Sequence, residues 1–261
     1  MDDNREMRMQ ASRYARQEVL PEIGKEGQQR LGASSVLIVG CGALGCMQAE
    51  LLARAGVGRM HIVDRDLVEL TNLHRQIAFT EQDAFSRASK AEAAAKRLRS
   101  INSSIVIKAD AVDVTPRNVE SLIQDVDAVL DATDNFETRY LLNDACIKHE
   151  KPWVYGGVIG TEGVTLLVLP GKGPCLRCLM PVPPEPGSFP TCDTSGVLNA
   201  TAAIIASWQA TAVLRLLVGS PPPEQRLVSI NPWDGTFNSF KVEKAEGCSC
   251  CGLRGFEFLK A

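Results

Sequence analysis

The sequence has few histidines and almost no net charge, and each shortage counts against a class of function. Its 261 residues include three histidines, His61, His74 and His149, and none lies in a context that suggests the proton relay of a nicotinamide-dependent oxidoreductase. The formal net charge of −3 leaves no surplus of positive charge for nucleic acid or an anionic membrane surface. We therefore expect small molecules or proteins as partners.

A secretory signal, internal repeats and low-complexity tracts are also missing. Residues 1–10 are charged and contain no apolar core of the kind that a signal peptide has. The one long apolar stretch is Val197–Val218, and it is interrupted by Asn199, Ser207, Gln209 and Arg215. We predict a buried or interface helix there rather than a membrane span. Nine cysteines without a secretory signal indicate a reducing compartment, so we expect a cytoplasmic protein.

The most informative stretch begins with the apolar run Val36–Val39, which leads into Gly40-x-Gly42-x-x-Gly45 and then into helix-forming residues. This order predicts a strand, a phosphate-binding loop and a helix. The glycines allow the tight turn, the close approach of a phosphate to the backbone, and the packing of the helix on the strand. The anion is expected at the helix N-terminus, but the loop alone leaves NAD, FAD and ATP open.

Acidic and basic residues follow at the positions where a nucleotide needs them. A second strand, Met60–Asp64, ends in a carboxylate nineteen positions after Gly45, where a ribose hydroxyl is expected, although an aspartate that caps the strand is the alternative. A polar segment and an expected helix over residues 86–101 then supply Arg75 and Lys90. Two such cations fit a polyphosphate, while either alone would be read as a solvated surface residue.

Further strands are expected at residues 105–109 and 128–135, with a short helix at 119–124 between them. The last of these strands runs into Asp131, Asp134 and Asn135 at the carboxyl edge of a parallel sheet. Asp134 is placed there to hold Mg²⁺ on phosphate oxygens, and capping of the following helix is the alternative for Asp134 or Asn135.

The C-terminal half departs from simple strand-helix alternation. Two strands are expected over residues 153–169, and a hairpin over residues 226–241. The expected fold class is therefore α/β, with a Rossmann-like, mostly parallel sheet, helices on both faces, a mixed or antiparallel extension and a four-cysteine zinc site.

Two cysteine pairs, Cys175-x-x-Cys178 and Cys248-x-x-Cys251, predict that site. Four thiolates match tetrahedral Zn²⁺ and leave no open position for catalysis, so the zinc is expected to be structural. A thioredoxin-like redox pair is the alternative, but neither pair is expected to open a helix after a strand. Cys250 could replace a neighbouring ligand or remain a free thiol. The remaining cysteines expected to be packing residues are Cys41, Cys46 and Cys146.

Cys192 stands apart from the other cysteines, between a segment rich in proline and glycine, 181–190, and the long apolar helix. That segment is expected to be mobile. A thiol at the entry to a helix N-terminus has a lowered pKa and is more nucleophilic. An inert free cysteine is the alternative.

Taken together, the motifs of this chain resemble the ThiF/MoeB/HesA family, bacterial relatives of the ubiquitin-activating enzymes. The resemblance runs from Arg13 to Gly252. The motifs that carry it, besides the glycine loop and the cysteine pairs, are Arg13-Tyr14-x-Arg16-Gln17, Asp64-x-Asp66, Asn72-Leu73-x-Arg75-Gln76, Lys90 and Asp131-x-x-Asp134-Asn135.

The resemblance implies an adenylyltransferase that uses ATP and Mg²⁺ to activate the C-terminal glycine carboxylate of a small β-grasp sulfur-carrier protein ending in Gly-Gly. It implies that Asp64 holds the ribose, that Asn72, Arg75 and Lys90 contact phosphates, and that Asp134 binds Mg²⁺. It also implies a homodimer in which Arg16 reaches the partner's ATP, a covalent role for Cys192, and a sulfurtransferase or cysteine desulfurase as a further partner. The ATP-binding residues implied are Gly40, Gly42, Ala43, Gly45, Asp64, Asp66, Thr71, Asn72, Leu73, His74, Arg75, Gln76, Lys90, Asp134 and Asn135.

On this reading residues 1–261 form one adenylating domain, with a helical arm (1–33), a nucleotide-binding part (34–150) and a carrier-binding and zinc part (151–261). The alternatives are a superfamily member that cyclises a threonylcarbamoyladenosine base in tRNA, an NAD-dependent oxidoreductase and a non-catalytic zinc scaffold. The sequence does not reveal which carrier or pathway is served, thiamine (ThiS), molybdopterin (MoaD) or another.

Overall fold

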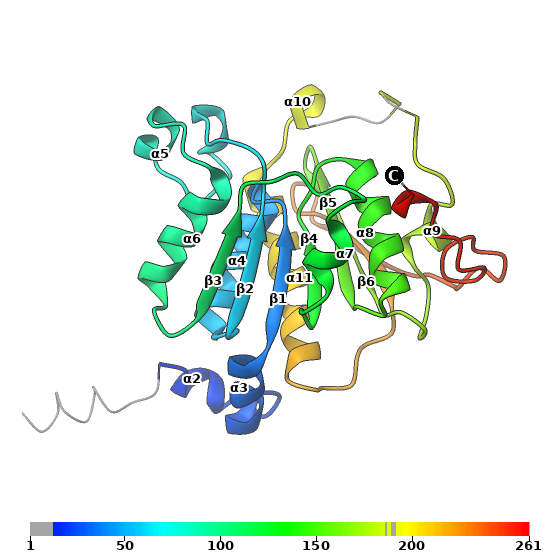
Figure 1. Ribbon diagram of the computed structural model, residues 1–261, viewed down its shortest axis with the longest axis horizontal. Helices are drawn as coiled ribbons and strands as arrows, with labels where there is room; N and C mark the ends of the chain where they lie inside the picture. The colour runs from blue at the N-terminus through cyan, green and yellow to red at the C-terminus, as the bar shows by residue number, and fades with distance from the viewer. Residues whose placement is uncertain (1–12, 186, 189–191, 261) are drawn as a thin grey trace, which may run out of the picture.

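An eight-stranded sheet forms the centre of the computed structural model, which describes residues 13–185, 187–188 and 192–260 (Figure 1). Its strand order is β3-β2-β1-β4-β5-β6-β7-β8, and the first five of these strands are parallel while β6, β7 and β8 are antiparallel. This arrangement confirms the expected fold class. The strands are β1 (Ser35–Val39), β2 (Arg59–Val63), β3 (Val106–Asp110), β4 (Ala128–Asp131), β5 (Trp153–Ile159), β6 (Glu162–Val168), β7 (Arg226–Asn231) and β8 (Thr236–Lys241).

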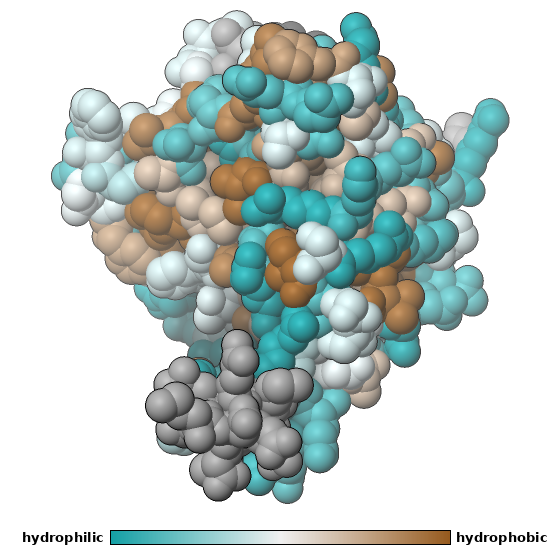
Figure 2. All heavy atoms as spheres, turned by 90° about the vertical axis from the view of Figure 1, so that its left-hand side faces the viewer, coloured by the Kyte–Doolittle hydropathy of each residue, from teal (hydrophilic) through white to brown (hydrophobic). Residues whose placement is uncertain are grey.

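Helices cover both faces of the sheet. Residues of α4, α6 and α11 share one hydrophobic cluster with β1 and β2, and residues of α7 and α8 share a second cluster on the opposite face. On the side of the molecule where α5, α6 and β3 lie, hydrophobic side chains are interspersed with hydrophilic ones (Figure 2). The longer helices are α3 (Gly24–Ala33), α4 (Ala43–Ala55), α6 (Lys90–Ile101), α8 (Phe136–Lys148) and α11 (Asn199–Leu217). The short ones are α2 (Ala15–Glu18), η1 (Leu70–Asn72), α5 (Glu81–Phe85), α7 (Val119–Ile123), α9 (Leu176–Leu179), α10 (Cys192–Ser195) and η2 (Glu257–Leu259).

Strand β1 lies inside the sheet because its sequence is apolar on both faces. All five of its residues are buried. Val36 and Ile38 pack in the cluster that contains α4, whereas Leu37 and Val39 pack in the cluster that contains α8. A continuous apolar run is typical of a parallel strand covered on both sides.

Helix α11 is long and apolar enough, by length and composition, to cross a membrane. In this fold it packs against α4, β5 and β6. Its Gln209 is fully buried, donates a hydrogen bond to the backbone oxygen of Asp131 (2.9 Å) and accepts one from Gln48 (2.6 Å). These contacts bury one face of α11, while Ile204 and Trp208 stay 37% and 43% exposed, so the prediction of a buried or interface helix between residues 197 and 218 is confirmed for a helix with one buried face.

Two helix predictions need correction. The helix expected at residues 86–101 begins at Lys90, because Ser89 caps it and Arg87 adopts a positive φ of 50° that interrupts a helix. The helical arm expected over residues 1–33 is divided into α2 and α3, and residues 1–12 lie outside the described part of the chain.

Candidate functional site

The carboxyl ends of three neighbouring strands line up at the edge of the sheet that is uppermost in Figure 1. Val39 of β1 pairs with Val63 of β2 on one side and with Asp131 of β4 on the other. The next residue on each strand is Gly40, Asp64 or Ala132, so three of the predicted motifs begin side by side. Ligands of open α/β sheets bind at such an edge.

The glycine loop has the close contacts that only glycine allows. Gly40 has a φ of +92°, and a Cβ there would lie 2.6 Å from the backbone oxygen of Ala132. A Cβ on Gly45 would lie 2.0 Å from the backbone oxygen of Gly40. At Gly42, by contrast, a Cβ would have only the Gln76 Nε2 atom within 4 Å, at 3.8 Å.

Because Gly42 also provides no side chain to cap α4, the amides of its first turn are available to an anion. Ala43, the first residue of α4, lies in this turn. The loop therefore fits a phosphate group.

Asp64 is held beside the loop by two backbone amides. Its Oδ2 atom accepts a hydrogen bond from the amide of Cys41 (2.5 Å), and its Oδ1 atom accepts one from the amide of Asp66 (2.7 Å). Burial raises the pKa of the carboxyl, whereas these two hydrogen bonds act in the opposite direction. A carboxylate has about four acceptor positions, so Asp64 keeps capacity for a ribose hydroxyl.

Lys90 lies near the same edge of the sheet, where it forms an ion pair with Asp66. Its side chain is 9% exposed, and its Nζ atom lies 2.9 Å from Oδ2 of Asp66. The amide of Lys90 also donates to the backbone oxygen of Asp66 (3.0 Å). Two residues predicted to bind the nucleotide are thus paired with each other, which fixes the start of α6 against the segment that follows β2.

The segment Thr71–Gln76 carries the other predicted phosphate contacts. Arg75 is half-buried as a residue, and its guanidinium donates to the backbone oxygen of Thr71 (2.9 Å), while His74 Nδ1 lies 3.1 Å from the same oxygen. Asn72 is buried and accepts a hydrogen bond from the amide of Glu69, so part of its amide group serves the local turn.

Gln76 and Leu73 complete that segment. Gln76 is buried, and its Oε1 atom has no hydrogen-bond partner among the described residues. The Nε2 atom of the same Gln76 side chain is the atom nearest to a Cβ placed on Gly42, so the unpaired oxygen lies close to the glycine loop. Leu73 packs against the hydrophobic cluster around α4.

Asp134 and Asn135 have different surroundings, and the capping alternative applies to one of them. Asn135 is the N-cap of α8, because its Oδ1 atom accepts a hydrogen bond from the amide of Thr138 (2.8 Å). Asp134 is exposed, and its carboxylate makes no hydrogen bond or salt bridge within the described ranges. A carboxylate held next to a capped helix start and left unpaired fits a Mg²⁺ ligand.

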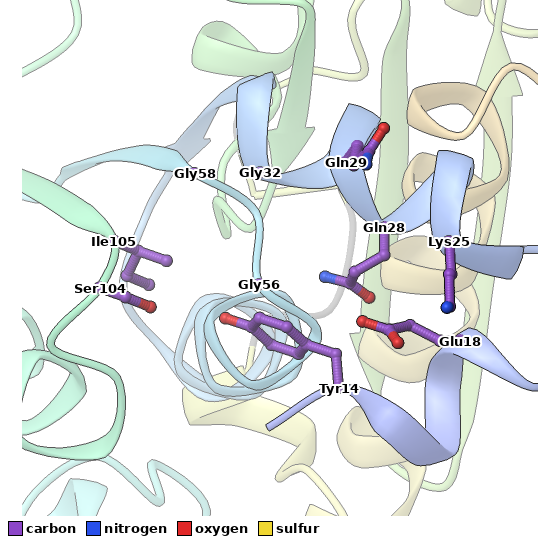
Figure 3. A pocket seen from close by; sticks show the side chains of 10 residues that line it. All are labelled: Tyr14, Glu18, Lys25, Gln28, Gln29, Gly32, Gly56, Gly58, Ser104 and Ile105. Atoms are coloured by element: carbon purple, nitrogen blue, oxygen red, sulfur yellow. The ribbon is translucent and has the colours of Figure 1, made fainter. Parts of the chain in front are cut away.

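The N-terminal motif lies at the other end of the sheet. Tyr14 packs on Gly56 and its hydroxyl accepts a hydrogen bond from Asn102 (2.8 Å), while Gln17 donates to the backbone oxygen of Ala55 (2.9 Å). Figure 3 shows Tyr14 beside Gly56, in a hollow of about 280 Å³. Arg13 donates to the backbone oxygen of Ile101 (2.7 Å).

Arg16, within the same motif, is exposed and has no hydrogen bond or ion pair to any other described residue. The arm lies at the C-terminal end of α4, and a 13-residue helix is about 20 Å long. Arg16 therefore does not come near the glycine loop of its own chain.

The four cysteines of the predicted zinc site converge. Their sulfur atoms all lie within 4.8 Å of one another. Cys175 and Cys248 are 3.6 Å apart, and Cys178 and Cys251 are 3.4 Å apart. A tetrahedral site with Zn–S bonds of about 2.3 Å requires sulfur atoms about 3.8 Å apart, so the quartet fits Zn²⁺.

Cys250 is excluded from this quartet and stays a buried thiol that accepts a hydrogen bond from Asn143 (3.2 Å). A hydrogen bond with Cys250 lowers the pKa of Cys175 to about 4, although burial acts in the opposite direction. Contrary to the sequence expectation, Cys175 does precede a short helix, α9. Cys41, Cys46 and Cys146 are buried, as expected.

Cys192 is the first residue of α10, whose last residue is two positions before Val197. Its side chain lies outside the described part of the structure, as do residues 189–191. The prediction of a nucleophilic Cys192 therefore stays a prediction.

Comparison with known proteins shows the family of this chain. A model of the ThiF family matches residues 14–250. The chain belongs to the ThiF family. It is 43% identical to the sulfur carrier protein ThiS adenylyltransferase of Bacillus subtilis (strain 168), over 95% of this chain and 73% of that protein. It is 39% identical to the sulfur carrier protein adenylyltransferase of Thermus thermophilus, over 92% of this chain and 90% of the relative.

Among solved structures, Escherichia coli MccB with AMPCPP and selenomethionine MccA aligns with a TM-score of 0.82, covering 93% of this chain and 74% of MccB. At 23% identity this likeness shows the fold alone. The relatives of this ThiF-family chain do not favour the tRNA-cyclising or oxidoreductase alternatives.

Sequence reasoning missed two arginines that lie beside the candidate site. Arg139 of α8 is buried and ion-paired with Asp131 (3.4 Å), and Arg65 pairs with Asp113 (2.8 Å). Asp113 raises the pKa of Arg65. In the sequence, Arg139 follows Thr138 on an expected helix, where an arginine is usually exposed to solvent. No local sequence pattern therefore predicts that it is buried.

Proposed function

We propose that this protein adenylates the C-terminal glycine carboxylate of a small ubiquitin-like sulfur-carrier protein at the expense of ATP. The observation that carries the proposal is the convergence, in a chain of this family, of the glycine loop, Lys90, Arg75 and Asp134 along one edge of the sheet. The relatives named as sulfur carrier adenylyltransferases support it. Released pyrophosphate and a carrier ready for thiocarboxylate formation are the products.

The residues have complementary tasks in binding ATP. The loop and first turn of α4, from Gly40 to Gly45, receive a phosphate, and Asp64 accepts hydrogen bonds from the ribose. Arg75 and Lys90 neutralise the phosphate chain, with Gln76 supplying its amide near Gly42. The supporting positions are Asp66, Thr71, Asn72, Leu73, His74 and Asn135, which hold the segments that carry these groups.

The reaction needs charge neutralisation more than acid-base catalysis. A carboxylate oxygen of the carrier attacks the α-phosphorus, the bond from that phosphorus to the bridging oxygen breaks, and pyrophosphate leaves with the electron pair. The attacking carboxylate is already ionised, so no general base is required. Placing the reactants and stabilising the leaving charge are the main sources of rate.

Two metal ions have separate roles in this proposal. Asp134 would hold Mg²⁺, which when bound neutralises charge on the phosphate oxygens. Cys175, Cys178, Cys248 and Cys251 would hold a structural Zn²⁺. Paired cysteines that bind a metal are typical of a reducing compartment, and we place the protein in the cytoplasm.

We also propose a homodimer whose site is completed by Arg16 of the other subunit. Three residues of the N-terminal motif are tied to the ends of α4 and α6 in their own chain, whereas Arg16 is exposed at the end of the sheet opposite the glycine loop. An arginine so placed can reach a triphosphate only in a second copy.

Co-expressing an Arg16→Ala subunit with an Asp134→Ala subunit tests this arrangement. We expect each variant alone to be inactive, and the mixture to recover about one quarter of wild-type pyrophosphate exchange. Random pairing makes half of the dimers mixed, and each mixed dimer of a two-fold assembly holds one intact site. A mixture that stays at the level of the single variants contradicts the exchange of Arg16 between subunits.

The function is tested by ATP-pyrophosphate exchange against a panel of purified ThiS-like and MoaD-like carriers. We expect exchange with one of them, and none when its final glycine is deleted. Cys192→Ala should leave the exchange unchanged, because its thiol would act only in a later sulfur-transfer step, in which a sulfurtransferase or cysteine desulfurase serves as donor. Stabilisation by NAD but not by ATP, with no exchange for any carrier, would overturn the proposal.

A further inference from the structure

Arg139 is a cation that the fold has buried beside the nucleotide site. It lies on the first turns of α8 and is only 7% exposed. Its Nη2 atom donates to the backbone oxygens of Thr133 (2.7 Å) and Gly156 (3.2 Å), and its Nε atom lies 3.4 Å from Oδ2 of Asp131. The guanidinium also lies near the rings of Phe136 and Tyr155, 5.2 and 5.4 Å from the ring centroids.

Asp131 holds Thr133 from the other side. Its Oδ1 atom accepts hydrogen bonds from the amide (2.9 Å) and the hydroxyl (2.7 Å) of Thr133. The amide of Thr133 belongs to the peptide unit before it, and its carbonyl belongs to the unit that leads into Asp134. Asp131 and Arg139 therefore fix both peptide planes around Thr133, and we call this pair the Thr133 clamp.

The clamped segment touches both parts of the site. Ala132 donates its amide to the backbone oxygen of Val39 (2.9 Å), and its own carbonyl blocks any side chain at Gly40. On the other side Asn135 is fixed as the N-cap of α8. Asp134 thus stands between two anchored residues, while its carboxylate stays exposed and unpaired within the described structure.

Stability alone is a poor explanation for this buried pair. Asp131 is fully buried, and the Nε atom of Arg139 makes no hydrogen bond in the described structure. Replacing such a pair by apolar side chains of similar volume is often neutral or stabilising in proteins. Burial also raises the pKa of Asp131, against which the Arg139 charge acts.

We propose that Arg139 is a positioning residue, which through the Thr133 clamp sets the orientation of the Asp134 carboxylate toward Mg²⁺. The inference rests on the proposed function, because it assigns Mg²⁺ to Asp134. Lysine at position 139 keeps the charge, but it has no guanidinium plane that can place one nitrogen on the two carbonyl oxygens while another faces the Asp131 carboxylate. Arg139→Lys should therefore loosen the segment without emptying the site of positive charge.

The first measurement is amide hydrogen exchange of residues 131–136 without nucleotide or metal. We expect Arg139→Lys to raise the exchange rate about tenfold. The second is the Mg²⁺ concentration that gives half of the ATP-induced shift in melting temperature, and half of maximal pyrophosphate exchange. Both concentrations should rise about tenfold, while the maximal rate at saturating Mg²⁺ recovers most of the wild-type value.

Arg177→Lys is the matched control. Arg177 is also a buried arginine facing a buried carboxylate of α8, with its Nη1 atom 3.8 Å from Oδ1 of Asp144, but it lies between two cysteines of the quartet. We expect this variant to lose thermal stability and to keep the wild-type Mg²⁺ requirement. Should Arg139→Lys fail to fold, Thr133→Val removes one bond of the clamp and should shift both readouts in the same direction by a smaller factor.

The possible results distinguish a failure of the Thr133 clamp from a failure of the proposed adenylation reaction. Unchanged exchange of residues 131–136 in the folded Arg139→Lys protein overturns the clamp. Faster exchange with an unaltered Mg²⁺ requirement in the thermal-shift measurement overturns the link to Asp134. The wild-type protein could show the Mg²⁺-dependent thermal shift with ATP and yet no pyrophosphate exchange with any carrier. That result contradicts the proposed function. The clamp is then decided by the amide hydrogen exchange and by the Mg²⁺ requirement of the thermal shift.

Discussion

Replacing Asp134 by alanine is expected to reduce carrier-dependent pyrophosphate exchange at least about 100-fold while leaving the melting temperature nearly unchanged. Removing a group that stabilises charge in a transition state commonly costs a factor of about 10² to 10³. The folded protein should tolerate the change, because the Asp134 carboxylate is exposed and makes no hydrogen bond or salt bridge to another described residue. Helix α8 keeps its cap, since Asn135 supplies it.

Glu137→Ala is the control for this variant. Glu137 is an exposed carboxylate on the first turn of α8, three residues farther along the same segment. It changes the net charge by the same amount near the same helix end, so a purely electrostatic effect on the helix would affect both variants. Normal pyrophosphate exchange by purified Asp134→Ala protein would remove Asp134 from the proposed mechanism.

Arg75→Ala belongs to the same prediction and should cause a loss of similar size. In the structure its guanidinium is held by the backbone oxygen of Thr71, a contact that a loop can lose without unfolding the core. The loss should appear in the rate at saturating ATP, because Arg75 neutralises charge that grows as pyrophosphate leaves.

How far the sequence predicts this molecule depends on whether a feature is local. The strand before Gly40, the glycine loop and α4 are contiguous, so periodicity and glycine spacing were sufficient to predict them. The two cysteine pairs are about seventy residues apart in the chain. Because tetrahedral Zn²⁺ needs four ligands and each pair supplies two, the spacing within the pairs predicted a quartet. The structure confirms that the four sulfur atoms converge. The edge positions of Asp64 and Asp134 followed from strand ends in a parallel sheet.

Features that depend on long-range packing could not be predicted. Gln48 and Gln209 are 161 residues apart and form a buried amide pair, and no local pattern links them. The burial of Arg139 depends on Asp131 at the end of β4 and on Gly156 of β5, which are brought together only by the sheet. In the same way, the motif around Tyr14 suggested a site residue, but only the fold shows that three of its members are anchors and that Arg16 lies at the end of the sheet opposite its own glycine loop.

Removing metal from the cysteine quartet is the second change for which we expect a large effect. Cys248→Ala, or treatment with a zinc chelator, should lower the melting temperature on the order of 10 °C, because structural zinc sites contribute several kcal/mol to folding and about 1 kcal/mol shifts a chain of this size by about 2–4 °C. The metal would join the segment after β6 to the C-terminal segment through four bonds, which the surrounding polar and aromatic contacts between these segments support.

The tail beyond the quartet should loosen with it. Phe258 packs against Tyr140 with ring centroids 5.0 Å apart, and its amide donates to Oδ2 of Asp144 (3.1 Å). Glu257 pairs with Arg177, which lies between two of the cysteines. Since the quartet anchors both sides of these contacts, losing the metal should make residues 254–260 exchange amide hydrogens faster.

Cys250→Ala tells metal binding apart from simple loss of a cysteine. Cys250 is fully buried beside the quartet but does not belong to it, so this variant should still bind one zinc per chain by elemental analysis, whereas Cys248→Ala should bind none. ATP should still stabilise both proteins, because the quartet and the glycine loop share no residue and pack in different clusters. If Cys248→Ala kept its zinc and Cys250→Ala lost it, the ligand assignment would be wrong, and Cys250 would take the fourth position that the sequence had left open.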